Sequence, residues 1–198
     1  EAPCKIISHT NEGLYKSTRY LAEDGDNIFI RENRLLQIKN RVFAIQTEMF
    51  DSIVSARKPY GLEAETMLKA SKYGLPDFSN EPYKNGYRIL GLGEKQKRMW
   101  KYIPKDYPIP KRNIALNKYK VFIAEAYGCG AIGEVASTPV LSTPGELCTE
   151  TFLQIGPFET EIEANYCCKY IYTKFFRAMV GIQKQTQHTT QKAYRFVP

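Results

Sequence analysis

The sequence has no long run of apolar residues, and this excludes one class of protein at once. A membrane-spanning helix needs about 20 consecutive apolar residues, and no stretch of the 198-residue chain approaches that length. Nor does the chain open on an apolar segment of the kind that forms a signal peptide. We therefore expect a soluble, cytoplasmic protein with no membrane partner.

Metal-binding and disulfide signatures are also missing. The five cysteines form no C-x-x-C pair, and their odd number argues against a closed disulfide framework. The two histidines, His9 and His188, do not stand beside a cysteine or a carboxylate at a metal-ligand spacing. We expect reduced thiols and no metal site in this chain.

Catalytic and cofactor-binding motifs are equally scarce. The sequence has no nucleophile elbow, no G-x-x-x-x-G-K-S/T phosphate loop and no Asn-Pro-Pro-aromatic motif, with which amino-methylating enzymes hold an extruded base. In "AYGCGAIGE", Gly128, Gly130 and Gly133 have the G-x-G-x-x-G spacing of a dinucleotide-binding loop. Pro139 and Pro144 prevent the long helix that would hold a pyrophosphate. The glycines instead predict a close backbone approach or a turn with positive φ.

One segment is compatible with a nuclease. In "PDFSNEPYK", Asp77, Glu81 and Lys84 are the residue types of a metal-dependent site built from two carboxylates and a lysine. Their spacing is poor, because two residues separate Glu81 from Lys84 and Asp77 is too close for the usual strand pairing. The segment is more typical of a turn rich in Pro and Asn. Because the residue types match although their spacing does not, a small metal-dependent nuclease stays an alternative.

Positive charge is in excess and is unevenly distributed. Lys and Arg number 28 against 21 Asp and Glu, a formal net charge of +7. No acidic residue follows Glu163, and the run "KQKRMWKYIPKDYPIPKR" contains a single carboxylate, Asp106. Charge segregation of this kind favours an anionic polymer as partner. A basic module that binds RNA or an acidic protein is the second alternative.

Hydrophobic periodicity predicts an α+β fold. Apolar residues recur every three or four positions from residue 33 to about 46, which predicts a helix, and "MFDSIVSA" predicts a short helical turn that ends before Pro59. The strand candidates "YRILGL", "RMWKYI", "KYKVFIAEA" and "ETFLQIG" alternate with prolines and turns. Thr160 and Glu163 have the spacing of a capping box before a helical pattern that continues to Ile182. We expect a mixed or antiparallel sheet, a long C-terminal helix packed on it and an N-terminal helical segment.

Side chains suited to holding nucleic acid occur together in three loop-like places. Lys and Arg bind phosphates, amide and guanidinium groups read base edges, and aromatic rings stack on bases. The three places are Arg57, Lys58 and Tyr60; Lys97, Arg98, Trp100 and Lys101; and Lys184, Gln185, Gln187, His188, Thr189 and Thr190.

Four stretches of the chain, taken together, resemble a known family. They are "SIVSARKPYGL", "KYKVFIAEAYGCG", "CTETFLQIGPFETEIEANYCCKYIYTKFFRAMV" and "QKQTQHTTQKAYRFVP". As a set they resemble the TaqI-like target-recognition region at the C-terminus of adenine-specific DNA methyltransferases from restriction-modification systems. The resemblance runs from about Ile28 to Pro198, and the group includes fused methylase-endonucleases.

The resemblance implies a parent enzyme that transfers a methyl group from S-adenosylmethionine to N6 of adenine in double-stranded DNA. The methyltransferase domain would precede Glu1, so this chain would hold no cofactor and no catalytic residue. Residues 1–50 would be a linker and helical segment, and residues 51–198 the DNA target-recognition domain. Because the chain begins without a methionine and opens on a polar stretch with no strand or helix signal, we expect a piece of a longer protein.

The resemblance also places three loops near the DNA. We assign phosphate contacts to Lys95, Lys97, Arg98 and Lys101, and base contacts to Arg57, Gln185 and Gln187. The three DNA-proximal loops are Arg57, Lys58, Tyr60 and Gly61; Tyr127, Gly128 and Gly130; and Lys184 to Thr190, with Lys184, Gln185, Gln187, His188 and Thr189 as the contact residues.

Overall fold

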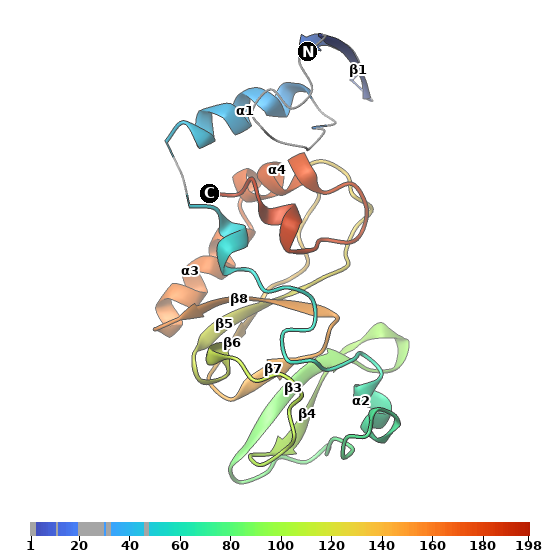
Figure 1. Ribbon diagram of the computed structural model, residues 1–198, viewed down its shortest axis with the longest axis vertical. Coiled ribbons are helices and arrows are strands. Elements are labelled where there is room, and N and C mark those ends of the chain that lie inside the picture. Colours follow the sequence, from blue (N-terminus) through green and yellow to red (C-terminus); the bar gives the residue numbers. More distant parts are fainter. Residues whose placement is uncertain (1–2, 11, 20–29, 31–32, 46–47) are drawn as a thin grey trace.

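The strands of this chain form three small sheets rather than one large sheet. A computed structural model describes residues 3–10, 12–19, 30, 33–45 and 48–198. Within these ranges, four α-helices accompany the three sheets, which confirms the predicted α+β fold. Figure 1 shows the N-terminal hairpin at one end of the long axis and β3 and β4 at the other, with the C-terminal helices α3 and α4 between α1 and the other two sheets.

The N-terminal hairpin corrects the expectation that the chain opens without a strand. β1 (Cys4–Thr10) and β2 (Gly13–Arg19) pair antiparallel along their whole length. In β1, Ile6 and Ser8 are buried while Ile7 is exposed. A polar residue thus faces inward and an apolar one faces outward, so the alternation that marks a half-buried strand is lost from the sequence.

The predicted N-terminal helix is present as α1 (Asn33–Phe43), and its predicted last residue, Gln46, lies outside the described residues. The predicted turn before Pro59 is a single 3-10 turn, Phe50–Ile53. A short helix, α2 (Thr66–Lys69), continues into a second 3-10 turn, Ala70–Tyr73. These short elements connect the N-terminal part of the chain to the first of the two larger sheets.

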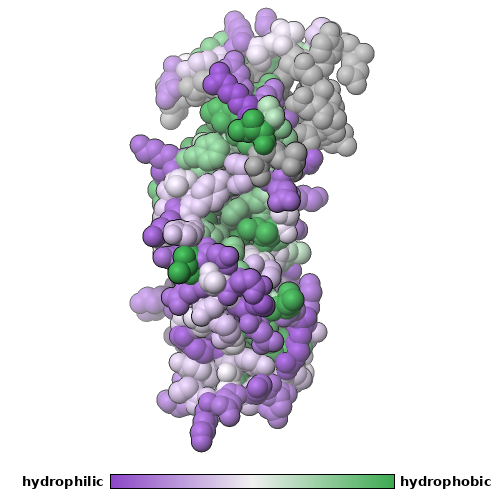
Figure 2. Space-filling model, turned by 90° about the vertical axis from the view of Figure 1, so that its left-hand side faces the viewer, coloured by the Kyte–Doolittle hydropathy of each residue, from purple (hydrophilic) through white to green (hydrophobic). Residues whose placement is uncertain are grey.

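That sheet has the order β4-β3-β7. β3 (Gly86–Leu92) and β4 (Arg98–Pro104) pair antiparallel, and β7 (Glu146–Cys148) pairs parallel with β3. A short 3-10 turn, Glu94–Gln96, joins β3 to β4. On the face seen in Figure 2, the end of the molecule that carries β3 and β4 is mostly hydrophilic.

The other sheet has the order β6-β5-β8 and is antiparallel. It comprises β5 (Tyr119–Ala124), β6 (Val140–Ser142) and β8 (Phe152–Phe158), and α3 (Glu161–Ile171) packs on it. Alternate residues of β5 enter different cores: Val121 and Ile123 belong to the core beneath α3, and Phe122 to the core shared with β3. A strand that is buried on both faces carries a continuous apolar run, here from Val121 to Ala124, which is why this strand was predictable.

The C-terminal helix is predicted correctly at its start and wrongly at its end. Thr160 accepts a hydrogen bond from the Glu163 N–H and forms the predicted capping box. The single long helix, however, is two helices, α3 and α4 (Lys174–Gln183). Thr173 begins α4 by accepting from the Phe176 N–H at 3.1 Å, a local capping bond that competes with continuation of α3. Two further 3-10 turns are Ile114–Asn117 and Gln191–Tyr194.

Two expectations from composition can be compared with the structure. Within the described ranges, none of the helices combines the length and the apolar character needed to cross a bilayer. Cys129, Cys148, Cys167 and Cys168 are free thiols, and burial raises the pKa of Cys167 to about 12.

Lys120 is a fully buried cation at the start of β5. Its ammonium group donates to the Lys118 carbonyl oxygen at 3.0 Å and to the Thr143 carbonyl oxygen at 2.8 Å. Burial lowers the pKa of Lys120 to about 8, and the nearby Glu146 and Cys148 oppose this shift. The ammonium group is therefore hydrogen-bonded only to neutral carbonyl oxygens. Because burial of this charge is costly, the protonated lysine lowers the stability of the folded state.

This environment predicts an unusual alkaline dependence of stability. Between the folded pKa of about 8 and the ordinary lysine value, the unfolded chain binds more protons, so the free energy of unfolding rises with pH. The contribution of Lys120 to the free energy of unfolding should increase by about 2 kcal/mol between about pH 7 and about pH 9.5. Urea unfolding of the wild type and of Lys120→Met across this range measures it. Parallel pH profiles of the two proteins would contradict the assignment, since other titrating groups affect both equally.

Candidate nucleic-acid interface

A cleft of about 440 Å³ lies where several strand ends and loops meet. The turn between β3 and β4 contributes Gln96, the start of β4 contributes Arg98, and Glu125 comes directly after β5. The start of β8 and the segment before it contribute Glu150, and the loop after β-bridge residue Val54 contributes Arg57. We call this the Arg57–Arg98 cleft. Its lining residues are Arg57, Leu92, Gln96, Arg98, Ala124, Glu125, Ala126, Ser137, Glu150, Thr151 and Phe152.

Arg57 and Lys58 share one carboxylate at the rim of this cleft. The Arg57 guanidinium lies 3.4 Å from a Glu150 oxygen, and the Lys58 ammonium lies 3.5 Å from the same oxygen. Lys58 also donates to Glu63, and this hydrogen bond raises the pKa of Lys58. More than half of the Arg57 side chain is exposed, so its guanidinium remains accessible from solvent.

Arg98 is fixed at the other side of the cleft. Its guanidinium donates to the Thr138 carbonyl oxygen at 2.8 Å and lies 5.4 Å from the centre of the Phe152 ring. Lys95 precedes it in the turn between β3 and β4, where Lys95 and Gln96 both adopt positive φ and make the connection tight. Lys95, Lys97 and Arg98 are exposed, whereas Lys101 lies farther along β4 and is half-buried.

The segment before the C-terminal 3-10 turn is paired with the end of β5. The Thr189 N–H donates to the Glu125 carbonyl oxygen at 2.6 Å, and the Tyr127 N–H donates to the Gln187 carbonyl oxygen at 2.9 Å. This pairing brings the ring of His188 to the Glu125 carboxylate, whose oxygens lie 3.0 and 3.3 Å from Nδ1. His188 is thereby attached to the Arg57–Arg98 cleft through Glu125, and Gln185 and Gln187 beside it are exposed.

The glycine-rich loop forms an anion-binding nest, but the anion it holds belongs to the protein. The Glu134 carboxylate accepts hydrogen bonds from the backbone N–H groups of Cys129, Gly130 and Ala131. It is also paired with Lys184. Burial opposes ionisation, but the Lys184 and backbone hydrogen bonds outweigh it, so the pKa of Glu134 is lowered. The backbone of this loop thus encloses Glu134.

Some of the predicted contact residues are buried in the structure, which contradicts their assignment as DNA contacts. Lys184 is almost fully buried, donates to the Tyr127 carbonyl oxygen at 2.7 Å and lies 3.6 Å from the centre of the Tyr127 ring. Gly128 encloses Glu134, and Gly130 contacts the backbone of Gln185. Lys184 and Gly130 are therefore buried and present no surface to DNA, whereas Tyr127 is partly buried and Gly128 is exposed, so these two assigned contacts stay predictions.

Tyr60 and Thr189 are also buried, which contradicts their assignment as DNA contacts, whereas Gly61 is only partly buried. Tyr60 is fully buried, and its hydroxyl donates to the Gln154 side-chain oxygen at 2.6 Å; burial raises the pKa of Tyr60. Gly61 has φ +73 and approaches Pro110 closely. Thr189 is buried beneath the paired segment. Trp100, in the second of the three places, is partly buried and lies beneath Arg88, whose guanidinium is 4.3 Å from the ring centre.

Sequence reasoning missed the two carboxylates of the cleft, Glu125 and Glu150. Both are largely buried, and a carboxylate is not a residue type that charge or amide content marks as a site for a polyanion. The sequence holds a weak signal for them. Glu125 directly follows an apolar strand pattern, in "FIAEA", and Glu150 directly precedes one, in "CTETF". What the sequence could not show is that these strand ends meet.

Of the three residues of the nuclease alternative, Asp77 has a local structural role. The Asp77 carboxylate accepts from the Ser71 N–H at 2.9 Å, and this backbone hydrogen bond lowers the pKa of Asp77. Glu81 and Lys84 are exposed in the loop that follows. In the described part of the chain, no group of three or more His, Cys, Asp or Glu side chains is arranged to hold a metal ion.

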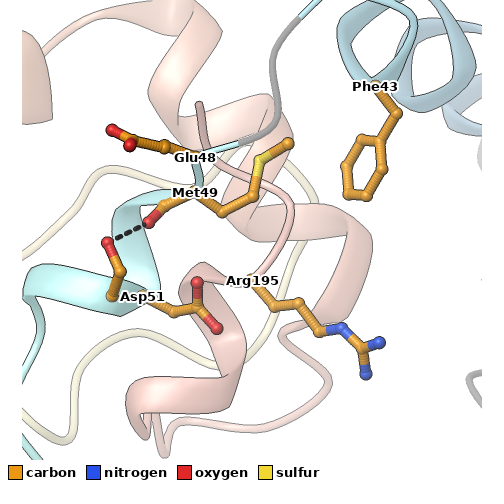
Figure 3. Close-up of a pocket in the computed structure, with 6 residues that line it drawn as sticks. Phe43, Glu48, Met49, Asp51 and Arg195 are labelled. Carbon is orange, nitrogen blue, oxygen red and sulfur yellow. Dashed lines mark hydrogen bonds between the residues drawn. The ribbon is translucent and has the colours of Figure 1, made fainter.

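A second cavity, of about 570 Å³, lies between α1 and the 3-10 turn at Phe50–Ile53. Figure 3 shows Phe43 across an open space from Met49, with Arg195 extending away from Asp51. None of the predicted contact residues lines this cavity. The Arg57–Arg98 cleft is therefore the candidate site.

Comparison of the chain with protein-family models, with curated proteins and with solved structures gives no match. The resemblance to target-recognition regions therefore stays a prediction, including its start near Ile28, which lies outside the described residues.

The glycine loop provides a test of how the C-terminal segment is positioned. A Cβ at Gly130 would lie 2.5 Å from the Gln185 carbonyl carbon, whereas a Cβ at Gly133 would meet nothing within 4 Å. Both glycines have positive φ, so Gly133→Ala should cost about 1 kcal/mol from backbone strain alone. Gly130→Ala should cost at least about 2 kcal/mol more, because backbone must move. Chemical denaturation of both variants measures the difference, and equal losses would show that the contact with Gln185 is not tight.

Proposed function

We propose that this chain is a DNA sequence-recognition module that docks on duplex DNA around the Arg57–Arg98 cleft. Its role would be to select the site at which an attached adenine-N6 methyltransferase domain acts, in the cytoplasm. That domain, and not this chain, would bind S-adenosylmethionine. An endonuclease domain in the same parent protein is compatible with this role.

One observation carries the proposal: the structure brings together residues that are far apart in the sequence and suited to DNA. Arg57 and Arg98 line one cleft, and Glu125 in the same cleft holds His188. Duplex recognition requires contacts from several elements on one side of the protein, since a groove and its flanking phosphates must be engaged together. The convergence of segments near residues 57, 98 and 188 on this cleft supports such a mode of binding.

The distribution of roles follows from exposure. Lys95 and Lys97 project from a tight turn at one side of the cleft and have the long, flexible side chains suited to phosphates. Arg57 is exposed at the other side, where a guanidinium could reach a base edge. Gln185 and Gln187 flank His188 on the paired segment, and their exposed amides can both donate and accept hydrogen bonds.

Lys97 provides the test of phosphate binding. Lys97→Ala should weaken binding to all duplex sequences by a similar factor and reduce the slope of log affinity against log salt by about one unit. Lys16→Ala is the matched control, because Lys16 is an exposed lysine on β2, in the hairpin at the opposite end of the molecule. Fluorescence anisotropy across a salt series measures both variants.

Competition separates this proposal from the two alternatives. Duplex DNA should displace a bound duplex probe more effectively than structured RNA or polyglutamate does. Preference for RNA or polyglutamate, or equal salt slopes for Lys97→Ala and the wild type, would count against it. Magnesium-dependent cleavage that is lost in Asp77→Ala would instead support the nuclease.

A further inference from the structure

The Arg57–Arg98 cleft contains two carboxylates, which a simple phosphate-binding surface does not need. Glu150 is neutralised by Arg57 and Lys58, both within 3.5 Å of one of its oxygens. Glu125 is different, because its side chain is held by His188 through the single nitrogen Nδ1. An ionised carboxylate has about four lone-pair sites, so one ring nitrogen leaves Glu125 with acceptor capacity at the cleft.

A carboxylate in a DNA interface has a restricted choice of partners. Phosphates repel it, and the guanine and thymine oxygens in the major groove are acceptors like the carboxylate itself. The groups that can donate to it there are the exocyclic amines, N4 of cytosine and N6 of adenine. A buried acceptor that finds no donor in the complex loses its hydration without compensation, so the wrong base is rejected.

We propose that Glu125 accepts a hydrogen bond from the exocyclic amino group of a cytosine or an adenine in the major groove. This inference rests on the proposed function and assigns the kind of base edge that the cleft selects. His188 is a positioning residue: its contact with both carboxylate oxygens fixes the orientation of Glu125, and the pairing of Thr189 with Glu125 fixes the backbone.

The surroundings of Glu125 fit this role. Arg98 is anchored by the Thr138 carbonyl oxygen and the Phe152 ring, so it provides a fixed positive charge in the same cleft without a direct contact to Glu125 that would occupy it. Arg57, at the rim, can hold the DNA backbone or a neighbouring base. A carboxylate that shares its cleft with two guanidinium groups can therefore approach polyanionic DNA at a reduced electrostatic cost.

The test combines protein variants with base analogues. Selection from a randomised duplex pool first gives the sequence that the wild-type chain prefers. Each adenine or cytosine of that sequence is then replaced singly by purine or by 2-pyrimidinone, which lack the amino group. For the wild type, one replacement should weaken binding about tenfold or more. For Glu125→Gln the same replacement should weaken binding by less than about threefold, because the charged acceptor is gone.

Two further comparisons keep the role of Glu125 distinguishable from a structural effect. Glu81→Gln, at an exposed glutamate outside the cleft, should respond to every analogue as the wild type does. His188→Ala should reduce the discrimination, and His188→Asn should restore part of it by supplying an N–H donor near the Nδ1 position. If Glu125→Gln fails to melt cooperatively, the His188 pair carries the comparison alone.

The outcomes distinguish a failure of the Glu125 assignment from a failure of DNA recognition by the chain. Identical losses for the wild type and Glu125→Gln with every analogue would overturn the inference while leaving DNA recognition intact. The inference would also fall if the wild type selects a sequence in which no amino group matters. If the pool shows no enrichment at all, the proposed function fails and this inference fails with it. A sensitive adenine or a sensitive cytosine identifies which amino group is read.

Discussion

The pairing of the C-terminal segment with the end of β5 is the interaction on which the candidate site depends. Two backbone hydrogen bonds, from Thr189 to Glu125 and from Tyr127 to Gln187, join parts of the chain that lie about 60 residues apart. Without them, the polar stretch after α4 would have little to hold it, because amides and hydroxyls bury little apolar surface. With them, His188 contacts Glu125, which lines the same cleft as Arg57 and Arg98.

The glycine-rich loop stabilises this pairing through Glu134 and Lys184. Its backbone N–H groups hold Glu134, which in turn pairs with the buried Lys184 at the start of the C-terminal segment. A buried ion pair contributes little net stability, but removal of one partner typically costs about 3 to 5 kcal/mol, because the other charge is left without compensation. The pair therefore acts mainly by fixing where the segment begins. The nest has the geometry of an anion site, and the protein fills it with its own carboxylate.

The sequence predicted the elements whose causes are local. β5 was predictable from its continuous apolar run, α3 from the Thr160 capping box, and α1 from its periodicity. The break at Thr173, the hairpin of β1 and β2 and the three-residue strands β6 and β7 were missed, because a single capping bond or a few pairings decide them. Of the predicted contacts, Arg57 and Arg98 lie together in the cleft, whereas Lys184 and Tyr60 are buried. Their partners Glu134 and Gln154 are distant in sequence, so no local pattern could separate a buried lysine or tyrosine from an exposed one.

The central claim is that segments near residues 57, 95–98 and 185–188 form one DNA-binding face, and hydrogen exchange measures this most directly. Addition of the selected duplex should slow amide exchange in these three segments together, while β1 and β2 at the opposite end of the molecule exchange as before. Protection confined to one of the three segments, or protection centred on the hairpin, would contradict the account.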